Sequence, residues 1–290
     1  MGITPPGKRV RPMSWDRYAE LVEQRWRALL ASKPKAELEL QNFLELHPCL
    51  LPFALAYTPA GEPAYGHHGT IHGAVFSQPR LPGAATDLRP DFMRITRSSS
   101  WVEISLFELK AARLRMFRTD GRFRDVFDAA RAQLQGYGSW LQDPHNWPAF
   151  VKAYQLPDYV DFRDFRLRLV LLSGRRDEVY SHPVSRDLRR REGEVISRSL
   201  DSLVPDVNAR DDITVRRARG RLVAQHVQPT MRYGPGNADG LAGITGLADA
   251  IERQPEIGPK RRAFLLDRLP YWQHWATAEG LHLHPAGYWE

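Results

Sequence analysis

The spacing of apolar residues predicts two helices near the N-terminus. In Ser14–Ser32, apolar residues recur every three or four positions behind a serine that can cap the first turn. A second helix is predicted over residues 35–47, because the same spacing resumes there and Pro48 cannot continue a helix. Residues 50–90 are rich in Gly, Pro and His, which predicts a loop with one short strand near residues 73–78.

Further elements are predicted along the rest of the chain. Residues 89–112 contain two apolar runs around a turn at Ser98–Ser100, which is the pattern of a β-hairpin. Phe165–Gly174 is the most apolar strand candidate, and residues 186–200 are expected to form a helix and then a short strand. Amphipathic helices are expected at three further places: residues 123–142, 239–254 and 259–280.

This order of elements predicts an α/β fold. Residues 35–204 would form its core, a mixed sheet flanked by helices, preceded by an N-terminal arm and helix over residues 1–34. The periodicity weakens beyond Val204, and residues 205–290 would be a C-terminal helical extension packed on the core. With 42% hydrophobic residues in a chain of 290, a core of this size can be buried.

Charge and cysteine content narrow the partners and the compartment. The formal net charge is +7 at pH 7, and a basic protein suits a phosphate-rich partner such as a nucleic acid, because neutralised phosphates release counterions. The single cysteine, Cys49, excludes an internal disulfide and favours a reducing, cytoplasmic location. The N-terminus lacks the apolar segment of a secretion signal, and no run approaches 18 apolar residues, so we expect no membrane association.

Two acidic residues, Asp91 and Glu108, are predicted to face each other across the hairpin. Side chains alternate faces along a strand, and a turn centred between Ser99 and Ser100 places residue 91 opposite residue 108, with Cβ atoms about 5 Å apart. Two carboxylates at this distance repel each other unless a cation lies between them. Mg²⁺ meets that need because it prefers oxygen ligands, and Mn²⁺ is the alternative.

Lys110 shares this face of the strand with Glu108. An ammonium group there can orient a metal-bound water or stabilise the charge that develops on an attacked phosphate. The common alternative is a solvated Glu–Lys pair at the end of a strand, since short motifs of this kind have a high false-positive risk. A further carboxylate could reach the site from the helix over residues 35–47, where Glu37 is the first candidate and Glu39 competes with it.

Arginines and histidines near this hairpin are candidate ligand-binding residues. A run of arginines is a solvated loop by default, but beside a metal site it is placed to hold phosphates, which guanidinium groups bind bidentately. His67, His68 and His72 suggest zinc only weakly, because no cysteine lies nearby and no helical HExxH is present, so loop packing or substrate contact is favoured. The arginines that directly follow the hairpin are Arg113, Arg115, Arg118, Arg122 and Arg124.

The motifs resemble those of a known nuclease superfamily. The segments "PDF" and "FELK", followed by "AxxQLxxYxxWL" with Gln133 and Tyr137 on one helical face, are similar to the PD-(D/E)XK signature and its QxxxY element. More narrowly, these and other segments in order over residues 35–278 look like the Shedu antiviral-defence nucleases. The resemblance implies a restriction-endonuclease-like core in which Asp91 and Glu108 hold metal and Lys110 and Gln133 support catalysis. Tyr137 would contact DNA together with the arginines.

These observations predict a Mg²⁺-dependent deoxyribonuclease. The expected reaction is hydrolysis of phosphodiester bonds, by nicking double-stranded DNA in anti-phage defence, with Asp91, Glu108 and Glu37 as metal ligands. The alternative is a catalytically silent nucleic-acid-binding or assembly module that keeps the nuclease fold. RNA is a weaker alternative substrate.

The C-terminal segment is unusually aromatic. Phe264, Leu265, Leu269, Trp272 and Trp275 lie near one face of the predicted helix, and Pro270 should kink or split it. Aromatic residues of this kind anchor protein–protein contacts, and relatives in the Shedu family assemble as homo-oligomers, so we expect a homo-oligomer, a dimer or a tetramer. The alternative is that this face packs on the chain's own core.

Overall fold

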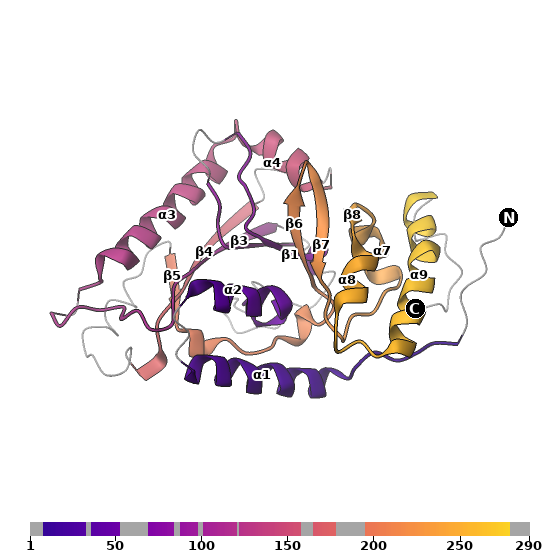
Figure 1. Ribbon diagram of the computed structural model, residues 1–290. Coiled ribbons are helices and arrows are strands. Elements are labelled where there is room, and N and C mark those ends of the chain that lie inside the picture. The colour runs from indigo at the N-terminus through magenta and orange to yellow at the C-terminus, as the bar shows by residue number, and fades with distance from the viewer. Residues whose placement is uncertain are drawn as a thin grey trace.

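One mixed β-sheet of eight strands runs through the molecule (Figure 1). Its strand order is β5-β4-β3-β2-β1-β6-β7-β8, in which β2 is antiparallel to both of its neighbours and the β3–β4, β4–β5, β1–β6 and β7–β8 pairs are parallel. The strands are β1 (Gly69–Ser77), β2 (Phe92–Arg97), β3 (Val102–Leu109), β4 (Phe165–Leu172), β5 (Val195–Arg198), β6 (Ile213–Ala218), β7 (Arg221–His226) and β8 (Ile244–Thr245).

Helices cover both faces of this sheet and one of its edges. Figure 1 shows α3 and α4 over one face, α1 and α2 over the other, and α7, α8 and α9 beside the β7–β8 edge. None of the helices in the described part of the chain is long and apolar enough to cross a membrane. The helices are α1 (Trp15–Ala31), α2 (Glu37–Leu46), α3 (Asp125–Gln142), α4 (Trp147–Tyr154), α7 (Pro235–Ala242), α8 (Leu247–Arg253) and α9 (Pro259–Ala278).

Some of the sequence-based predictions lie outside the described residues. These predictions are the turn at Ser98–Ser100, the helix within residues 186–194, and the positions of His67 and His68. The computed structural model describes residues 8–32, 36–52, 69–83, 88–97, 101–120, 122–157, 165–177 and 195–278.

Alternation along the central strands builds a hydrophobic core on each face of the sheet. On β3, Leu106 points into the core beneath α3 and α4, whereas Phe107 points into the core beneath α1 and α2. Helix α3 approaches the sheet closely at Gly138, where a Cβ atom would lie 2.9 Å from Leu167 Cδ2. That approach explains a glycine inside a helix, where it otherwise costs about 1 kcal/mol relative to alanine.

The predicted hairpin register is confirmed. Phe92 pairs with Phe107 and Arg97 pairs with Val102, so β2 and β3 match as if the turn were centred between residues 99 and 100. The strand expected near residues 73–78 is also present, although it begins earlier, at Gly69. The pairing of β2 with β3 places Asp91 just before the start of β2, beside the end of β3.

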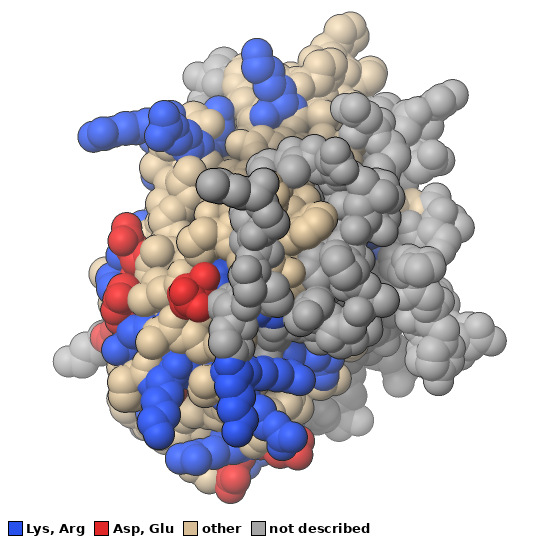
Figure 2. All heavy atoms as spheres, turned by 90° about the vertical axis from the view of Figure 1, so that its right-hand side faces the viewer, with Lys and Arg blue, Asp and Glu red and all other residues tan. Residues whose placement is uncertain are grey.

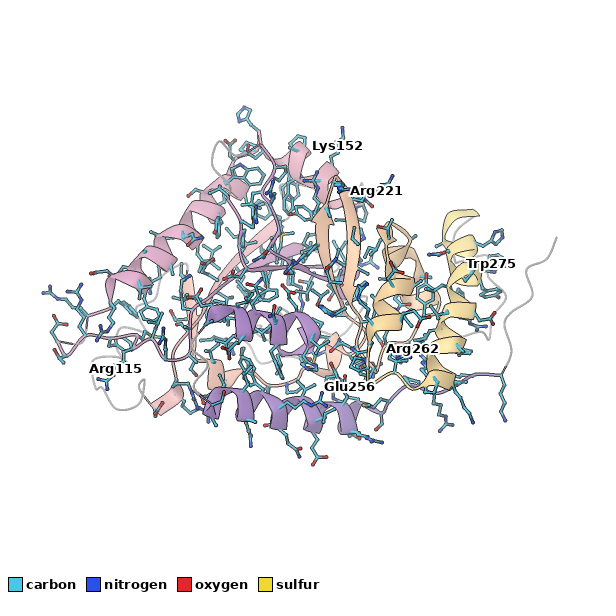
Figure 3. The ribbon with its side chains drawn as sticks, viewed as in Figure 1. Arg115, Lys152, Arg221, Glu256, Arg262 and Trp275 are labelled. Carbon is cyan, nitrogen blue, oxygen red and sulfur yellow. The ribbon has the colours of Figure 1, made fainter. Side chains whose placement is uncertain are left out.

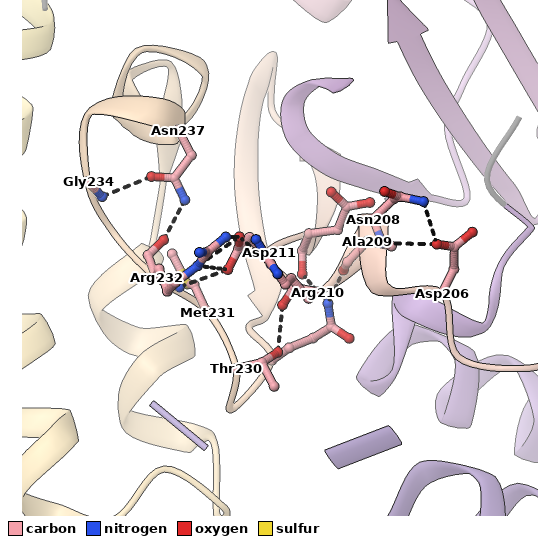
Figure 4. A network of polar contacts seen from close by, with 12 residues as sticks. Asp206, Asn208, Ala209, Arg210, Asp211, Thr230, Met231, Arg232, Gly234 and Asn237 are labelled. Atoms are coloured by element: carbon pink, nitrogen blue, oxygen red, sulfur yellow. Dashed lines mark hydrogen bonds and ion pairs between the residues drawn. The ribbon is translucent and has the colours of Figure 1, made fainter. Parts of the chain in front are cut away.

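The sheet does not end near residue 204, where the sequence placed the boundary of the core. Strands β6, β7 and β8 come from residues 205–290, and β6 pairs in parallel with β1. They were missed because arginines occupy half-exposed strand positions and hide the apolar alternation. A polar network around Asp211, Arg232 and Asn237, shown in Figure 4, ties the start of β6 to the start of α7.

The C-terminal helices also differ from the prediction. The single helix expected over residues 239–254 is two helices, α7 and α8, separated by β8 and by Gly246, whose φ is +74°. Helix α9 continues through Pro270 without being split, and Trp272 on its aromatic face is fully buried in the core. Packing within the chain therefore accounts for most of this face, and homo-oligomer formation stays a prediction.

Candidate active site

The start of β2 and the end of β3 bring two carboxylates together where these two interior strands terminate. The backbone N–H of Asp91 donates to the Phe107 carbonyl over 3.1 Å, which continues the hairpin ladder by one residue. The backbone N–H of Leu109 donates to Oδ2 of Asp91 over 2.7 Å. The Asp91 carboxylate is thus held against β3, next to the position from which Glu108 projects.

Both carboxyl groups are unusually hard to ionise. Burial raises the pKa of Asp91 to about 6, although the Leu109 N–H and the nearby Lys110 oppose the shift. Burial also raises the pKa of Glu108 to about 7, and the negative charge of Asp91 adds to the effect. Because both pKa values lie near neutral and the charge of Asp91 raises that of Glu108, the pair tends to retain a proton close to neutral pH.

Lys110 lies directly beside this pair. Its backbone N–H donates to the Leu172 carbonyl over 2.9 Å, and its Nζ donates to Oε1 of Glu108 over 2.8 Å. Burial alone would lower the pKa of Lys110, but the attraction of Glu108 and the other nearby carboxylates outweighs burial and raises that pKa. The side chain is therefore a charged donor rather than a neutral base at physiological pH.

Helix α2 brings one more carboxylate to Lys110. Oε2 of Glu37 lies 3.9 Å from Nζ of Lys110, whereas Glu39 is exposed on another face of the helix. Of the two glutamates, Glu37 is therefore the one that reaches Lys110. That distance makes Glu37 an ion-pair partner of Lys110. No group of three or more His, Cys, Asp or Glu side chains in the described ranges is close enough to hold a metal ion together, so Glu37 does not complete a metal site with Asp91 and Glu108.

Helix α3 supports the site through a chain of hydrogen bonds. The Gln133 side-chain amide donates to the Tyr137 hydroxyl, which donates to the Arg89 carbonyl over 3.1 Å, two residues before Asp91. The predicted pairing of Gln133 and Tyr137 on one helical face is therefore present. Tyr137 is only 1% exposed, so its place is inside the protein, where it positions the start of β2, and not on a DNA-contacting surface.

The carboxylates of Asp91 and Glu108 fit a hard divalent cation. Glu108 is 4% exposed, and its Oε2 atom is buried without a hydrogen bond from any described residue. An ionised oxygen in that state is costly unless a cation or a proton binds it. Mg²⁺ commonly takes one or two protein carboxylates and completes its shell with waters and substrate phosphates, so Asp91 and Glu108 suffice as the protein ligands.

Glu108→Gln is expected to stabilise the metal-free protein at pH 8. The raised pKa means that Glu108 stabilises the fold most below its unfolded pKa of about 4.5 and loses that contribution as pH rises toward 7. Glutamine does not ionise, so we expect a gain of about 1–3 kcal/mol at pH 8 that disappears near pH 4.5. Chemical denaturation in EDTA at both pH values measures it.

Glu103→Gln is the matched control for this prediction. Glu103 is also buried, but it accepts two hydrogen bonds from Arg168, at 2.7 Å and 3.3 Å. Its replacement should lower stability at pH 8, because a charge-assisted interaction is lost. A Glu108→Gln variant that is equally or less stable than the wild type at pH 8 would contradict the assigned burial cost.

The arginine-rich loop directly follows β3, beside the end of the strand that carries Glu108. All five arginines are exposed, and Figure 3 shows Arg115 projecting from the body of the protein. Two of them have acidic partners, since Arg118 pairs with Asp125 and Arg122 lies 3.9 Å from Asp120. Stacked Phe117 and Phe123 rings, 5.0 Å apart, hold the base of the loop. The structure thus presents these guanidinium groups to solvent next to the carboxylates.

His72 has a packing role. Its Nδ1 lies 3.1 Å from the Gly240 carbonyl and its Nε2 lies 2.8 Å from the Tyr154 carbonyl, so the ring fastens α7 and α4 to β1. It occupies a bulge in β1, where the register shifts between Thr70 and Val75. This agrees with the preference for loop packing over zinc binding.

Backbone groups are the part of the site that the sequence did not indicate. The Leu109 N–H and the Arg89 carbonyl orient Asp91 and Tyr137, but main-chain atoms leave no signature in residue identity. The register of the hairpin was the one available signal. Once Asp91 is placed opposite Glu108, the N–H of the next residue on β3 is within reach.

Comparison with protein families gives one match. The model of a family described as "Shedu protein SduA, C-terminal" matches residues 35–212, which include the carboxylate pair, Lys110 and the Gln133–Tyr137 helix. No curated protein matches the chain. Because the family match covers more than half of its length, the protein belongs to the Shedu family, which points to anti-phage defence and to a nuclease-type enzyme.

Proposed function

We propose that this protein is a metal-dependent endonuclease that nicks double-stranded DNA in anti-phage defence. The observation that carries the proposal is the buried pair of Asp91 and Glu108 at one edge of the sheet, with the Lys110 ammonium 2.8 Å from Glu108. Asp91 and Glu108 would hold Mg²⁺, or Mn²⁺ in its place. A bound ion would polarise a phosphodiester and make a coordinated water more acidic.

The chain's own residues divide the remaining work. Lys110 is kept protonated, so it can donate to an attacking water or to a non-bridging phosphate oxygen on which negative charge grows. Glu37 also pairs with that ammonium, at 3.9 Å. Gln133 is a positioning residue, because it acts on Asp91 through Tyr137 and the Arg89 carbonyl.

The direct test is cleavage of supercoiled plasmid by the purified protein. Conversion to the relaxed form with Mg²⁺, and no conversion with EDTA, is the expected result. Intact plasmid under both conditions, together with salt-dependent binding, would favour the catalytically silent DNA-binding module instead. Parallel incubation with structured RNA distinguishes the two substrate classes.

The arginine-rich loop is expected to supply backbone affinity. Replacing Arg113, Arg115 and Arg118 with glutamine should weaken binding to unrelated DNA sequences equally, because phosphate contacts carry no sequence information. The slope of log K against log salt should fall by up to about 2–3, at about 0.9 for each phosphate that is no longer neutralised. Fluorescence anisotropy on a 20-base-pair duplex in EDTA measures both.

A matched control changes charge elsewhere on the surface. Arg11 before α1 and Arg17 and Arg27 on α1 are exposed, and replacing these three with glutamine should leave the slope nearly unchanged. If the loop variant binds normally but cleaves poorly, the arginines act at the reacting phosphate, and the assignment to backbone affinity is wrong.

A further inference from the structure

The turn of the β6–β7 hairpin lies at the same end of the strands as the carboxylate pair. The sheet register defines one transverse row, because partners on successive strands are directly paired: Val215, Phe76, Met93 and Leu106. If that register continues for two more residues, Arg217 falls in line with Gln78, Asp91 and Glu108, and the Gln78 N–H does donate to the Asp91 carbonyl over 2.8 Å. Because faces alternate, the side chains of Arg217, Asp91 and Glu108 would then also share one face of the sheet.

The tip of this hairpin is strongly basic. Arg219 and Arg221 are exposed and Arg217 is half-buried, and residues 213–226 contain no Asp or Glu. The Nε atom of Arg217 is buried without a hydrogen-bond partner among the described residues. Arg216, on the opposite face, is different, because its guanidinium binds Glu45 over 2.6 Å. The structure thus pairs Arg216 with a carboxylate, whereas the arginines at and near the tip have no carboxylate partner in the described part of the chain.

The turn at the tip carries an arginine at a position where asparagine would be conformationally better. Arg219 and Gly220 both have positive φ, +50° and +78°, as a two-residue hairpin turn requires. Asparagine is the preferred residue before the glycine, because residues with a Cβ rarely adopt positive φ and asparagine tolerates it best. An arginine at this position gives up some local stability and places a cation at the tip.

Helix α4 adds a further cation. Lys152 is exposed near its end, and the neighbouring Tyr154 donates from its hydroxyl to the Arg80 carbonyl over 2.8 Å, just after β1. Figure 3 shows Lys152 and Arg221 at the same end of the molecule. We define the hairpin patch as Lys152, Arg217, Arg219 and Arg221.

A second gathering of basic side chains is less well placed. Figure 2 shows Lys and Arg at the upper end of one face and again at its lower end, where Asp and Glu lie among them. The N-terminal arm belongs to the lower end, since Arg261 of α9 donates to the Val10 carbonyl and Met13 donates to the Pro229 carbonyl. Pro229 follows the far end of β7, so this gathering lies away from the carboxylates.

We propose that the hairpin patch is a second phosphate-binding surface for the DNA duplex held at the carboxylate pair, an inference that rests on the proposed nuclease function. Two to three strand spacings of about 4.8 Å separate β2 from the hairpin, which gives about 10–15 Å. That span is roughly three to four base-pair rises of 3.4 Å. The patch and the arginine-rich loop lie on opposite sides of the carboxylates and would hold the backbone on either side of the scissile bond.

The test removes charge without disturbing the fold. A triple variant with Lys152→Gln, Arg219→Asn and Arg221→Gln changes only exposed side chains, and asparagine suits the turn, so its melting temperature should match or exceed that of the wild type. Its affinity for a 20-base-pair duplex, measured by anisotropy in EDTA at low salt, should fall about tenfold or more. The salt slope should fall by about 2–3.

The control variant combines Arg11→Gln, Arg17→Gln and Lys260→Gln, which removes the same charge at the other end of the molecule. It should bind DNA nearly as the wild type does. Equal affinity and slope for the hairpin variant and the wild type would overturn the proposal, as would a larger loss in the control. Binding is measured in EDTA, so it does not depend on cleavage. If the wild type nicks plasmid and the hairpin variant binds DNA as tightly as the wild type, the hairpin patch is wrong and the proposed nuclease function stands.

Discussion

Lys110→Ala is expected to slow Mg²⁺-dependent DNA nicking by about 10²–10³-fold, which is the usual cost of removing one electrostatic donor from an active site. The reason lies in its place beside Glu108, at 2.8 Å, with a pKa raised by the surrounding carboxylates. Among the described lysines, Lys110 is the one whose charge lowers the pKa of both carboxylates. Initial rates of plasmid relaxation, measured with saturating Mg²⁺, give the effect.

The roles of the carboxylates and the lysine can be separated. Asp91→Asn and Glu108→Gln should lose both nicking and the rise in melting temperature that Mg²⁺ gives the wild type. Lys110→Ala should lose nicking and keep that rise, because the lysine is not a ligand. Lys260→Ala, at the exposed start of α9, is the matched control and should behave as the wild type. If Lys110→Ala nicks normally while Glu108→Gln does not, the lysine has no part in the chemistry.

Asp212→Ala is expected to destabilise the protein by about 3–5 kcal/mol. Asp212 is 4% exposed and lies 3.1 Å from the guanidinium of Arg94, which is fully buried in the middle of β2. Arg94 also donates to the carbonyls of Leu51 and Pro48, at 2.7 Å and 3.1 Å. Removing the carboxylate leaves a buried cation without its counter-charge, which is far more costly than losing an exposed ion pair. Urea denaturation at pH 7.5 measures the change.

Two comparisons test that explanation. Asp211→Ala removes the adjacent carboxylate, which binds the partly exposed Arg232, and should cost about 1 kcal/mol or less. The double variant Arg94→Met with Asp212→Leu replaces the pair with apolar groups and should recover much of the loss. A cost for Asp212→Ala no greater than that for Asp211→Ala would show that the buried charge is satisfied elsewhere.

The central part of the site could be predicted because it depends on local periodicity. One turn position fixes the whole register of β2 and β3, so residue 91 had to face residue 108. The four-residue spacing of Gln133 and Tyr137 likewise fixed their shared helical face. The choice of Glu37 over Glu39 needed the structure, because adjacent helical faces differ by too little in sequence alone.

Long-range features could not be predicted. Arg94 looks like an exposed strand residue until the loop after α2 and the start of β6 are seen to surround it. The strands β6 and β7 contain arginines at several positions, and the burial of these strands depends on α2 supplying Glu45 from 171 positions earlier in the sequence. Tyr137 was assigned to DNA contact, and only the packed structure shows that its hydroxyl is directed inward.

The parallel pairing of β1 with β6 has a practical consequence for any shortened version of this protein. The family match ends at residue 212, directly before β6, so a polypeptide cut there would retain Asp91, Glu108, Lys110 and the Gln133–Tyr137 pair. It would also turn β1, an interior strand with Val75 and Phe76 almost completely buried, into an open sheet margin. Unpaired margins of this kind recruit strands from other molecules and lead to insoluble aggregates. Soluble expression therefore calls for a fragment that keeps the β6–β7 hairpin, even though that hairpin lies beyond the recognisable domain.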